Sequence, residues 1–154
     1  MDQMDQTSGL QERFEEICKR AGLKLTHQRM EIYNELASRQ DHPSAEAIHE
    51  AIKANLPFIA LDTVYRTLKT LESIEAIRRL DVFDDQARFD ANLTPHHHCM
   101  CSRCKAIMDF KWDTFDALEA PGAVADWGHI WSKSVVFRGV CRNCLTQGSG
   151  LERH

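Results

Sequence analysis

Apolar residues recur at helical spacing through the first half of the chain and predict four helices. The first helix places Leu10, Phe14 and Ile17 on one side and stops at Gly22, a residue type typical of helix C-termini. The fourth, Asp62–Ser73, turns Val64, Leu68 and Leu71 inward. We expect a side-chain cap at the start of each later helix, by Thr26, Ser44 and Asp62.

After the fourth helix the apolar period changes from about 3.6 to about 2. Ile77–Phe83 and Arg88–Asp90 predict two strands joined by a polar turn at Asp84–Gln86. Helices followed by a two-stranded hairpin are the order of a winged helix, in which one helix enters the DNA major groove. The segment Asp62–Ser73 would be this recognition helix, and the hairpin would be the wing.

The remainder of the chain predicts a smaller β-β-α-β unit. Its strands are expected at His96–Met100, Ala106–Phe110 and Ile130–Val140, and its helix at Thr114–Glu119, ended by Pro121-Gly122. The unit has little core of its own, and such small units usually need a metal or a partner subunit for stability.

The predicted fold is therefore α+β, with two domains. Residues 1–89 would form a winged-helix DNA-binding domain with an extra N-terminal helix, and residues 90–95 a hinge. Residues 96–154 would form a dimerisation and metal-binding domain with a four-cysteine zinc site.

Composition indicates the cellular compartment of the protein but says little about its function. The chain has 154 residues and a net charge of −4, so overall charge gives no indication of a nucleic-acid partner. No apolar run approaches the roughly 20 residues needed to span a bilayer. The acidic N-terminus does not resemble a signal peptide. We therefore expect a cytoplasmic protein with no membrane contact, whose cysteines are reduced.

Two CxxC pairs carry the strongest chemical signal. Four thiolates at about 2.3 Å from one Zn²⁺ would complete a tetrahedral site with no position open for substrate, so the zinc would be structural. A redox-active dithiol is the alternative. Cys18 is interpreted as a small buried residue, and Cys99 as the same or as a residue with a ligand or redox role. The predicted zinc ligands are Cys101, Cys104, Cys141 and Cys144.

A His-rich run precedes the first CxxC pair and indicates a second metal site. Because strand side chains alternate, His96 and His98 would point the same way, about 7 Å apart, and His97 the other way. Asp90 and Asp109 could add carboxylates, and mixed ligands of this kind suit Fe²⁺, Mn²⁺ or Zn²⁺. An HxH pair alone is weak evidence, since many lie on surfaces. In isolation His42 reads as a surface loop residue.

The candidate DNA-contacting residues are polar and lie mainly on the Asp62–Ser73 helix. Arginine can reach guanine edges or phosphate, and tyrosine and threonine can contact phosphate or a thymine methyl group. A solvated helix face is the alternative interpretation. The candidates are Thr63, Tyr65, Arg66 and Lys69, with Arg29 and Arg78 from neighbouring elements.

Taken together, these segments resemble the ferric uptake regulator family of metal-dependent repressors, from about Leu10 to Cys144. The matching segments are LTHQRMEIY at 25–33, HPSAEAIHEAI at 42–52, DTVYRTLKTLE at 62–72, RFD at 88–90, HHHCMCSRC at 96–104 and GVCRNC at 139–144.

The resemblance implies a homodimer that binds palindromic double-stranded operator DNA and carries structural Zn²⁺ and regulatory Fe²⁺ or Mn²⁺. It also changes the interpretation of His42, which would be the ligand supplied by the DNA-binding domain. One ion held by both domains would fix the spacing of the two recognition helices, biasing the dimer toward the DNA-binding state. The implied regulatory ligands are His42, Asp90, His96, His98 and Asp109.

Within this family, Asp at positions 90 and 109 resembles the peroxide-responsive repressors. There, Fe²⁺ reacts with hydrogen peroxide and His ligands are oxidised, which here points to His42 and His96. An iron- or zinc-uptake regulator is the alternative within the family. Ser132-Lys133 stand where many relatives carry histidines, which argues against a third metal site.

Two other classes remain as alternatives. A metal-dependent hydrolase would use the His/Asp site to activate water, but the sequence offers no separate general base. A zinc-containing protein-interaction domain would have no regulatory site. The prediction is a regulator and not an enzyme.

Overall fold

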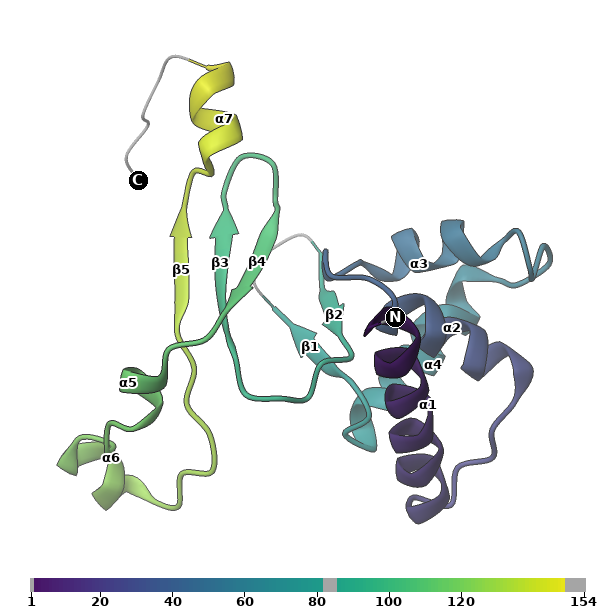
Figure 1. Cartoon of the computed structure of the whole chain (residues 1–154). Helices are drawn as coiled ribbons and strands as arrows, with labels where there is room; N and C mark the ends of the chain where they lie inside the picture. The colour runs from purple at the N-terminus through teal and green to yellow at the C-terminus, as the bar shows by residue number, and fades with distance from the viewer. Residues whose placement is uncertain (1, 82–85, 149–154) are drawn as a thin grey trace. The chain divides into compact units, whose positions relative to one another are not determined.

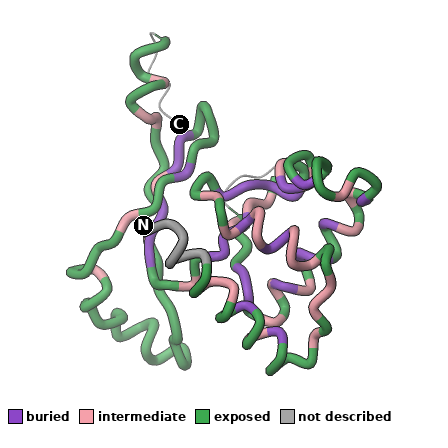
Figure 2. The backbone as a smooth tube through the Cα atoms, turned by 45° about the vertical axis from the view of Figure 1, so that its right-hand side comes forward, coloured by how far each residue is buried: buried purple, intermediate pink, exposed green. Residues whose placement is uncertain are grey.

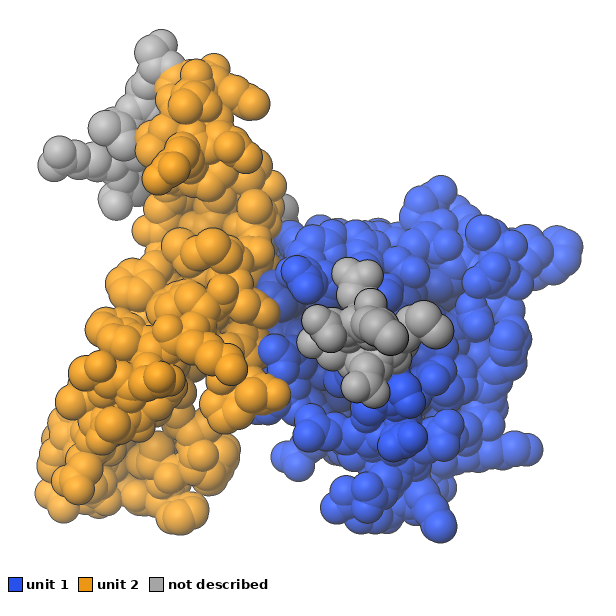
Figure 3. Space-filling view, in the orientation of Figure 1, with its two compact units in different colours: residues 1–93 blue, residues 94–154 orange. Residues whose placement is uncertain are grey.

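The computed structural model describes residues 2–81 and 86–148, with side chains from residue 8 onward. The chain divides into two compact units, Met1–Leu93 (unit 1) and Thr94–His154 (unit 2), which are coloured separately in Figure 3. Helices and strands occur in both, so the predicted α+β class is confirmed. No helix in the described part of the chain has the length and apolar character to cross a membrane.

Unit 1 contains four helices followed by a two-stranded antiparallel sheet (Figure 1), the order predicted for a winged helix. In the sheet, Arg78 pairs with Asp90 and Leu80 with Arg88. Of the predicted strand Ile77–Phe83, residues Arg78–Leu80 form β1. Val82 and Phe83 of that prediction, and most of the predicted turn Asp84–Gln86, lie outside the described residues. The elements are α1 (Asp2–Arg20), α2 (His27–Ala37), α3 (Ala45–Ile52), α4 (Leu61–Ser73), β1 (Arg78–Leu80) and β2 (Arg88–Asp90).

Local capping accounts for most helix boundaries of unit 1. The hydroxyl oxygens of Thr26 and Ser44 accept hydrogen bonds from backbone N–H groups in the first turns of α2 and α3, as predicted. Gly22, at φ +68°, follows α1 in the left-handed conformation expected of a helix stop. The cap predicted at Asp62 is wrong. Helix α4 begins at Leu61 after Ala60, without a side-chain cap, and Asp62 instead pairs with Arg66 within the first turn.

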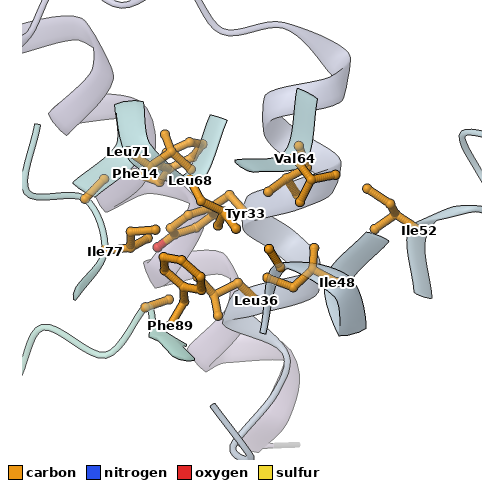
Figure 4. Packing of buried hydrophobic residues seen from close by; sticks show 14 of the residues in the cluster. Phe14, Tyr33, Leu36, Ile48, Ile52, Val64, Leu68, Leu71, Ile77 and Phe89 are labelled. Atoms are coloured by element: carbon orange, nitrogen blue, oxygen red, sulfur yellow. The ribbon is translucent and has the colours of Figure 1, made fainter. Parts of the chain in front are cut away.

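The helices enclose one apolar core, which also receives Ile77 and Phe89 from the hairpin (Figure 4). The rings of Phe14 and Tyr33 stack with centroids 3.8 Å apart, joining α1 to α2. Burial raises the pKa of Tyr33 to about 12. Cys18 is fully buried in the same core, in agreement with its interpretation as a small apolar residue.

Unit 2 is a three-stranded sheet with short helices, ordered β4-β3-β5 with β3 central. β3 pairs antiparallel with β4 and parallel with β5. The helix predicted at Thr114–Glu119 is shorter, Pro121-Gly122 leads into a further helix, and the last strand is only four residues long. The elements are β3 (His97–Cys101), β4 (Ile107–Phe110), α5 (Asp113–Asp116), α6 (Gly122–Trp127), β5 (Val136–Gly139) and α7 (Arg142–Gln147).

Burial differs sharply between the two units (Figure 2). In unit 2 the buried apolar side chains among the described residues are Met100, Cys101 and Ile107, all from β3 and β4. Trp127 and Trp131 are 80% and 86% exposed. The prediction that this unit lacks a sizeable core is confirmed.

Candidate metal centres and DNA-binding face

The two CxxC pairs converge at one end of unit 2. The first pair spans the end of β3 and the following turn, and the second lies at the start of α7. All four Sγ atoms lie within 4.8 Å of one another. The Sγ atoms of Cys101 and Cys144 lie 3.8 Å apart, and those of Cys104 and Cys141 lie 3.7 Å apart. Four sulfurs at about 2.3 Å from one Zn²⁺ are about 3.8 Å apart, so the group fits a tetrahedral zinc ion.

The backbone around this cluster favours thiolates. Burial opposes ionisation of Cys101, but backbone N–H groups, led by that of Cys141, outweigh it and lower the pKa of its thiol to about 6. The pKa of Cys144 is raised to about 12 because it shares hydrogen bonds with the thiols of Cys141 and Cys104. The pKa values of Cys101 and Cys144 are thus shifted in opposite directions. A central cation would remove this difference, because metal coordination deprotonates all its thiol ligands.

A His/Asp group lies on the opposite half of β3, within unit 2. The Nε2 atom of His96 lies 3.6 Å from one carboxylate oxygen of Asp109, and that of His98 lies 3.4 Å from the other. The register of the sheet produces this arrangement, since His98 pairs directly with Asp109 across β3 and β4. Ligand atoms at about 2.1 Å from one tetrahedral ion are about 3.4 Å apart, so the separation of Asp109 from each histidine suits ligands of a divalent cation.

Backbone contacts orient the first of these rings. The Nδ1 atom of His96 lies 2.6 Å from the carbonyl oxygen of Thr94. Because a carbonyl can only accept, Nδ1 donates this hydrogen bond, which leaves Nε2 as the nitrogen that could coordinate a metal. The structure therefore selects the nitrogen that faces Asp109.

His97 points to the other side of β3, as its alternation predicts. Its Nε2 atom lies 2.9 Å from Asp116 of α5, and its Nδ1 atom accepts a hydrogen bond from the Val135 N–H at 3.1 Å. Its ring also packs against Phe110 and Phe115. His97 thus fastens α5 and the start of β5 to the central strand. The sequence contains no local signal for this contact, because Asp116 is 19 positions away.

A second His/Asp pair lies within unit 1. The loop before α3 places Nδ1 of His42 at 3.8 Å from a carboxylate oxygen of Asp90, which ends β2. The other carboxylate oxygen of Asp90 accepts the Asn92 N–H at 2.8 Å, which orients the carboxylate. Both side chains are buried, which is unusual for such residues without a partner or a metal. Of the five implied regulatory ligands, His42 and Asp90 thus belong to unit 1, and His96, His98 and Asp109 belong to unit 2.

The predicted DNA contacts fall into separate groups on unit 1. Arg29, Thr63 and Arg66 line one hollow of about 280 Å³ between α2 and α4, together with Thr26, Gln28, Thr67 and Thr70. Lys69 is exposed on α4. Arg78 lies on β1, where its guanidinium donates to the Leu93 carbonyl oxygen at 2.9 Å. A hollow lined by hydroxyl groups and two guanidinium groups offers the donors that phosphate contacts use.

Sequence reasoning missed the residue that holds Tyr65. Its hydroxyl donates to the carboxylate of Glu46 on α3, and this bond raises the pKa of Tyr65. The second oxygen of Glu46 accepts from Gln86, just before β2, at 2.9 Å. Glu46 of α3 therefore contacts both α4 and the segment just before β2.

The family model for the ferric uptake regulator family matches residues 20–128. The peroxide-responsive repressor PerR of Staphylococcus epidermidis is 31% identical over 132 residues, covering 85% of this chain and 87% of the relative. PerR of Staphylococcus aureus strain Mu50 is 29% identical over 126 residues, covering 82% and 85%.

Solved structures of regulators resemble this chain as well. The ferric uptake regulator Fur of Helicobacter pylori, described as having three functional metal-binding sites, has a TM-score of 0.74 and 25% identity, covering 97% of this chain and 99% of that one. The Francisella tularensis regulator with iron has a TM-score of 0.69 and 27% identity, covering 80% and 96%.

Proposed function

This chain belongs to the ferric uptake regulator family, and we propose that it is a repressor that responds to hydrogen peroxide through a regulatory Fe²⁺ site. Proteins of this family are metal-dependent transcriptional regulators, not enzymes, and they bind operator DNA as dimers. The finer assignments concern the ligands, the signal and the DNA contacts.

Structural Zn²⁺ is assigned to Cys101, Cys104, Cys141 and Cys144. The observation that supports this assignment is that two sulfur separations, 3.7 and 3.8 Å, match the edge of a tetrahedron of four zinc-bound sulfurs. Because unit 2 has few buried apolar residues, the zinc would supply much of its folding free energy.

The regulatory ion is assigned to ligands from both units, His42 and Asp90 from unit 1 and His96, His98 and Asp109 from unit 2. An ion held by both groups restricts the orientation of the DNA-binding unit relative to the dimerisation unit. It favours the DNA-binding state only by the difference in its affinity for the two states. In a dimer on a palindromic operator, this orientation sets the separation of the two α4 helices, which must match half-sites about one helical turn apart.

The carboxylates at positions 90 and 109, together with the peroxide-responsive relatives, support peroxide as the signal. Fe²⁺ held by these ligands would supply the electron that cleaves the O–O bond of hydrogen peroxide. In the net reaction, one oxygen atom of hydrogen peroxide enters a ring C–H bond of histidine and the other leaves as water. His42 and His96 are the expected targets. An oxidised ring is a poorer ligand, so the ion is lost and the operator is released.

An iron-uptake regulator is the second candidate, because the Francisella tularensis relative is a ferric uptake regulator solved with iron. In such a protein, Fe²⁺ and Mn²⁺ would both activate DNA binding, and peroxide would leave the histidines intact. The same DNA-contacting residues would serve both functions, namely Arg29, Thr63, Tyr65, Arg66, Lys69 and Arg78.

The test loads the zinc-containing protein with Fe²⁺ or Mn²⁺ under anaerobic conditions, adds hydrogen peroxide, and follows operator binding together with peptide masses. We expect the iron form to release DNA and to gain the mass of one oxygen atom on His42 or His96. The manganese form is the matched control and should keep both its DNA and its mass. Retention of DNA and unmodified histidines in the iron form would favour the iron-uptake alternative.

A further inference from the structure

The loop that carries His42 has an unusual backbone. His42 adopts φ +50°, in the left-handed region that residues with a Cβ atom rarely enter. In this conformation its buried ring lies beside Asp90. A backbone of this kind persists only where the surrounding structure over-determines it.

Arg88, on β2, supplies such surroundings. Its guanidinium donates from Nη2 to the carbonyl oxygen of Asp41 at 2.7 Å, and from Nε to the carbonyl oxygen of His42. The next residue, Phe89, donates its backbone N–H to the carbonyl oxygen of Pro43 at 3.0 Å. Three consecutive carbonyl groups of the loop are thus bound by two consecutive residues of one strand.

A second arginine fixes the residue before His42. The guanidinium of Arg39 binds both carboxylate oxygens of Asp41, at 2.8 Å from Nε and 2.6 Å from Nη2. The hydrogen bond from Arg39 lowers the pKa of Asp41. The loop is therefore fixed by the side chain of Asp41 and by the backbone carbonyl groups of residues 41 to 43. The ring of His42 takes no part in these contacts and lies beside Asp90.

We propose that Arg88 is a positioning residue for the regulatory ion. Its two hydrogen bonds to the carbonyl groups of Asp41 and His42 keep His42 in the left-handed conformation, in which the His42 ring lies beside Asp90. This inference rests on the proposed function in one respect, that the ion uses His42 as a ligand. Arg88 itself touches no metal. Its loss should weaken the regulatory site and leave the four-cysteine zinc site in unit 2 unchanged.

The test titrates full-length, zinc-loaded protein with Mn²⁺ alone and measures free Mn²⁺ by electron paramagnetic resonance. Arg88→Ala should weaken Mn²⁺ binding about tenfold or more, the usual cost of losing a residue that orients a ligand. Arg88→Lys should fall between this variant and the wild type, because an ammonium group lacks the planar fork that matches two acceptors.

Arg79→Ala is the matched control. It removes the same charge from the partner strand β1, where Arg79 is exposed and pairs with Asp81 at 2.7 Å. Its Mn²⁺ affinity should stay within about twofold of wild type. Zinc content and thermal unfolding should be measured for every variant.

A second readout needs no regulatory ion. Backbone NMR of the zinc-loaded protein should show positive φ at His42 in the wild type and in Arg79→Ala, and loss of it in Arg88→Ala. A merely structural role would lower thermal stability without changing φ at position 42 or Mn²⁺ affinity.

Wild-type Mn²⁺ affinity and positive φ in folded Arg88→Ala would overturn the proposal. If that variant does not fold, wild-type affinity in Arg88→Lys would overturn it equally. If the wild type itself binds no Mn²⁺, the proposed function fails instead, and the NMR comparison still decides the role of Arg88.

Discussion

The fold of unit 1 and the fold of unit 2 are stabilised in different ways. Unit 1 buries Phe14, Leu36, Leu68 and other apolar residues in one core, and side chains cap two of its helices. The described helices of unit 2 have no side-chain caps, and its largest aromatic residues are exposed. Unit 1 therefore has a core that can support folding by itself, whereas we expect unit 2 to need its zinc and a second copy of the chain for stability.

The same contrast between the units agrees with the functions that we propose for them. A rigid apolar scaffold suits a recognition helix, whose side chains must keep their places against DNA. A unit whose stability comes from bound metal and dimerisation suits a sensor, because the occupancy of its sites changes its structure. The buried pair His42–Asp90 and the partly exposed pair His98–Asp109 are the positions from which DNA binding and metal sensing would be coupled.

The largest effect should follow from removing a zinc ligand. Cys144→Ser should lose the zinc, the folded sheet of unit 2 and the dimer, because structural zinc contributes about 10 kcal/mol or more of apparent binding free energy. Unit 1 should keep its own cooperative thermal transition. Circular dichroism melting, metal analysis and size-exclusion chromatography would measure these changes. Cys99→Ala, on the same strand but outside the cluster, is the control that should keep its zinc. Simultaneous unfolding of both units in Cys144→Ser would contradict the view that unit 1 folds independently of the zinc.

Truncation of a core side chain in unit 1 should destabilise unit 1 and leave unit 2 unaffected. Leu68 is fully buried on α4, so Leu68→Ala should cost about 2–5 kcal/mol in the free energy of unfolding of unit 1. Zinc content should not change. Denaturant unfolding measures the cost. Phe58→Ala, at a side chain that is 98% exposed, should cost no more than about 0.5 kcal/mol.

A smaller effect should come from the helix caps of unit 1. Ser44→Ala removes the hydroxyl that accepts the Ala47 N–H at 3.2 Å and should cost about 1 kcal/mol. Asp62→Ala removes only an exposed pair with Arg66 and should cost less than about 0.5 kcal/mol. Equal costs in urea unfolding would mean that Asp62 acts as a cap after all.

The smallest effect concerns pH. Because Arg39 lowers the pKa of Asp41 in the folded protein, the pair stabilises unit 1 above the ordinary carboxyl pKa, and the benefit disappears as the pH falls through the lowered value. The pair is partly exposed, so Asp41→Asn should cost less than about 1 kcal/mol at pH 7. At pH 2 the cost should shrink. A cost independent of pH, measured by urea unfolding at both values, would exclude the ion pair as its source.

Features set by neighbouring residues were predictable from the sequence. The caps at Thr26 and Ser44, the stop at Gly22 and the alternation of His97 and His98 all follow from local geometry. The Asp62 cap failed because α4 starts one residue earlier, which leaves the carboxylate inside the first turn.

Features set by distant residues were not predictable. Arg88 reaches Asp41 across 47 positions, and His97 reaches Asp116 across 19. The second helix of unit 2 was missed because Pro121 was interpreted only as an end, although proline is also tolerated where a helix begins. The residues that orient the candidate ligands therefore emerged only from the structure.

The central claim is that one ion binds His42 and Asp90 of unit 1 together with His96, His98 and Asp109 of unit 2. Paramagnetic broadening of NMR signals by one equivalent of Mn²⁺ on zinc-loaded protein tests it directly. We predict that amide signals around Asp90 and around His98 broaden together, at the same ratio of Mn²⁺ to protein, and that His42→Ala weakens both. Broadening confined to one unit, or unaffected by His42→Ala, would contradict the claim.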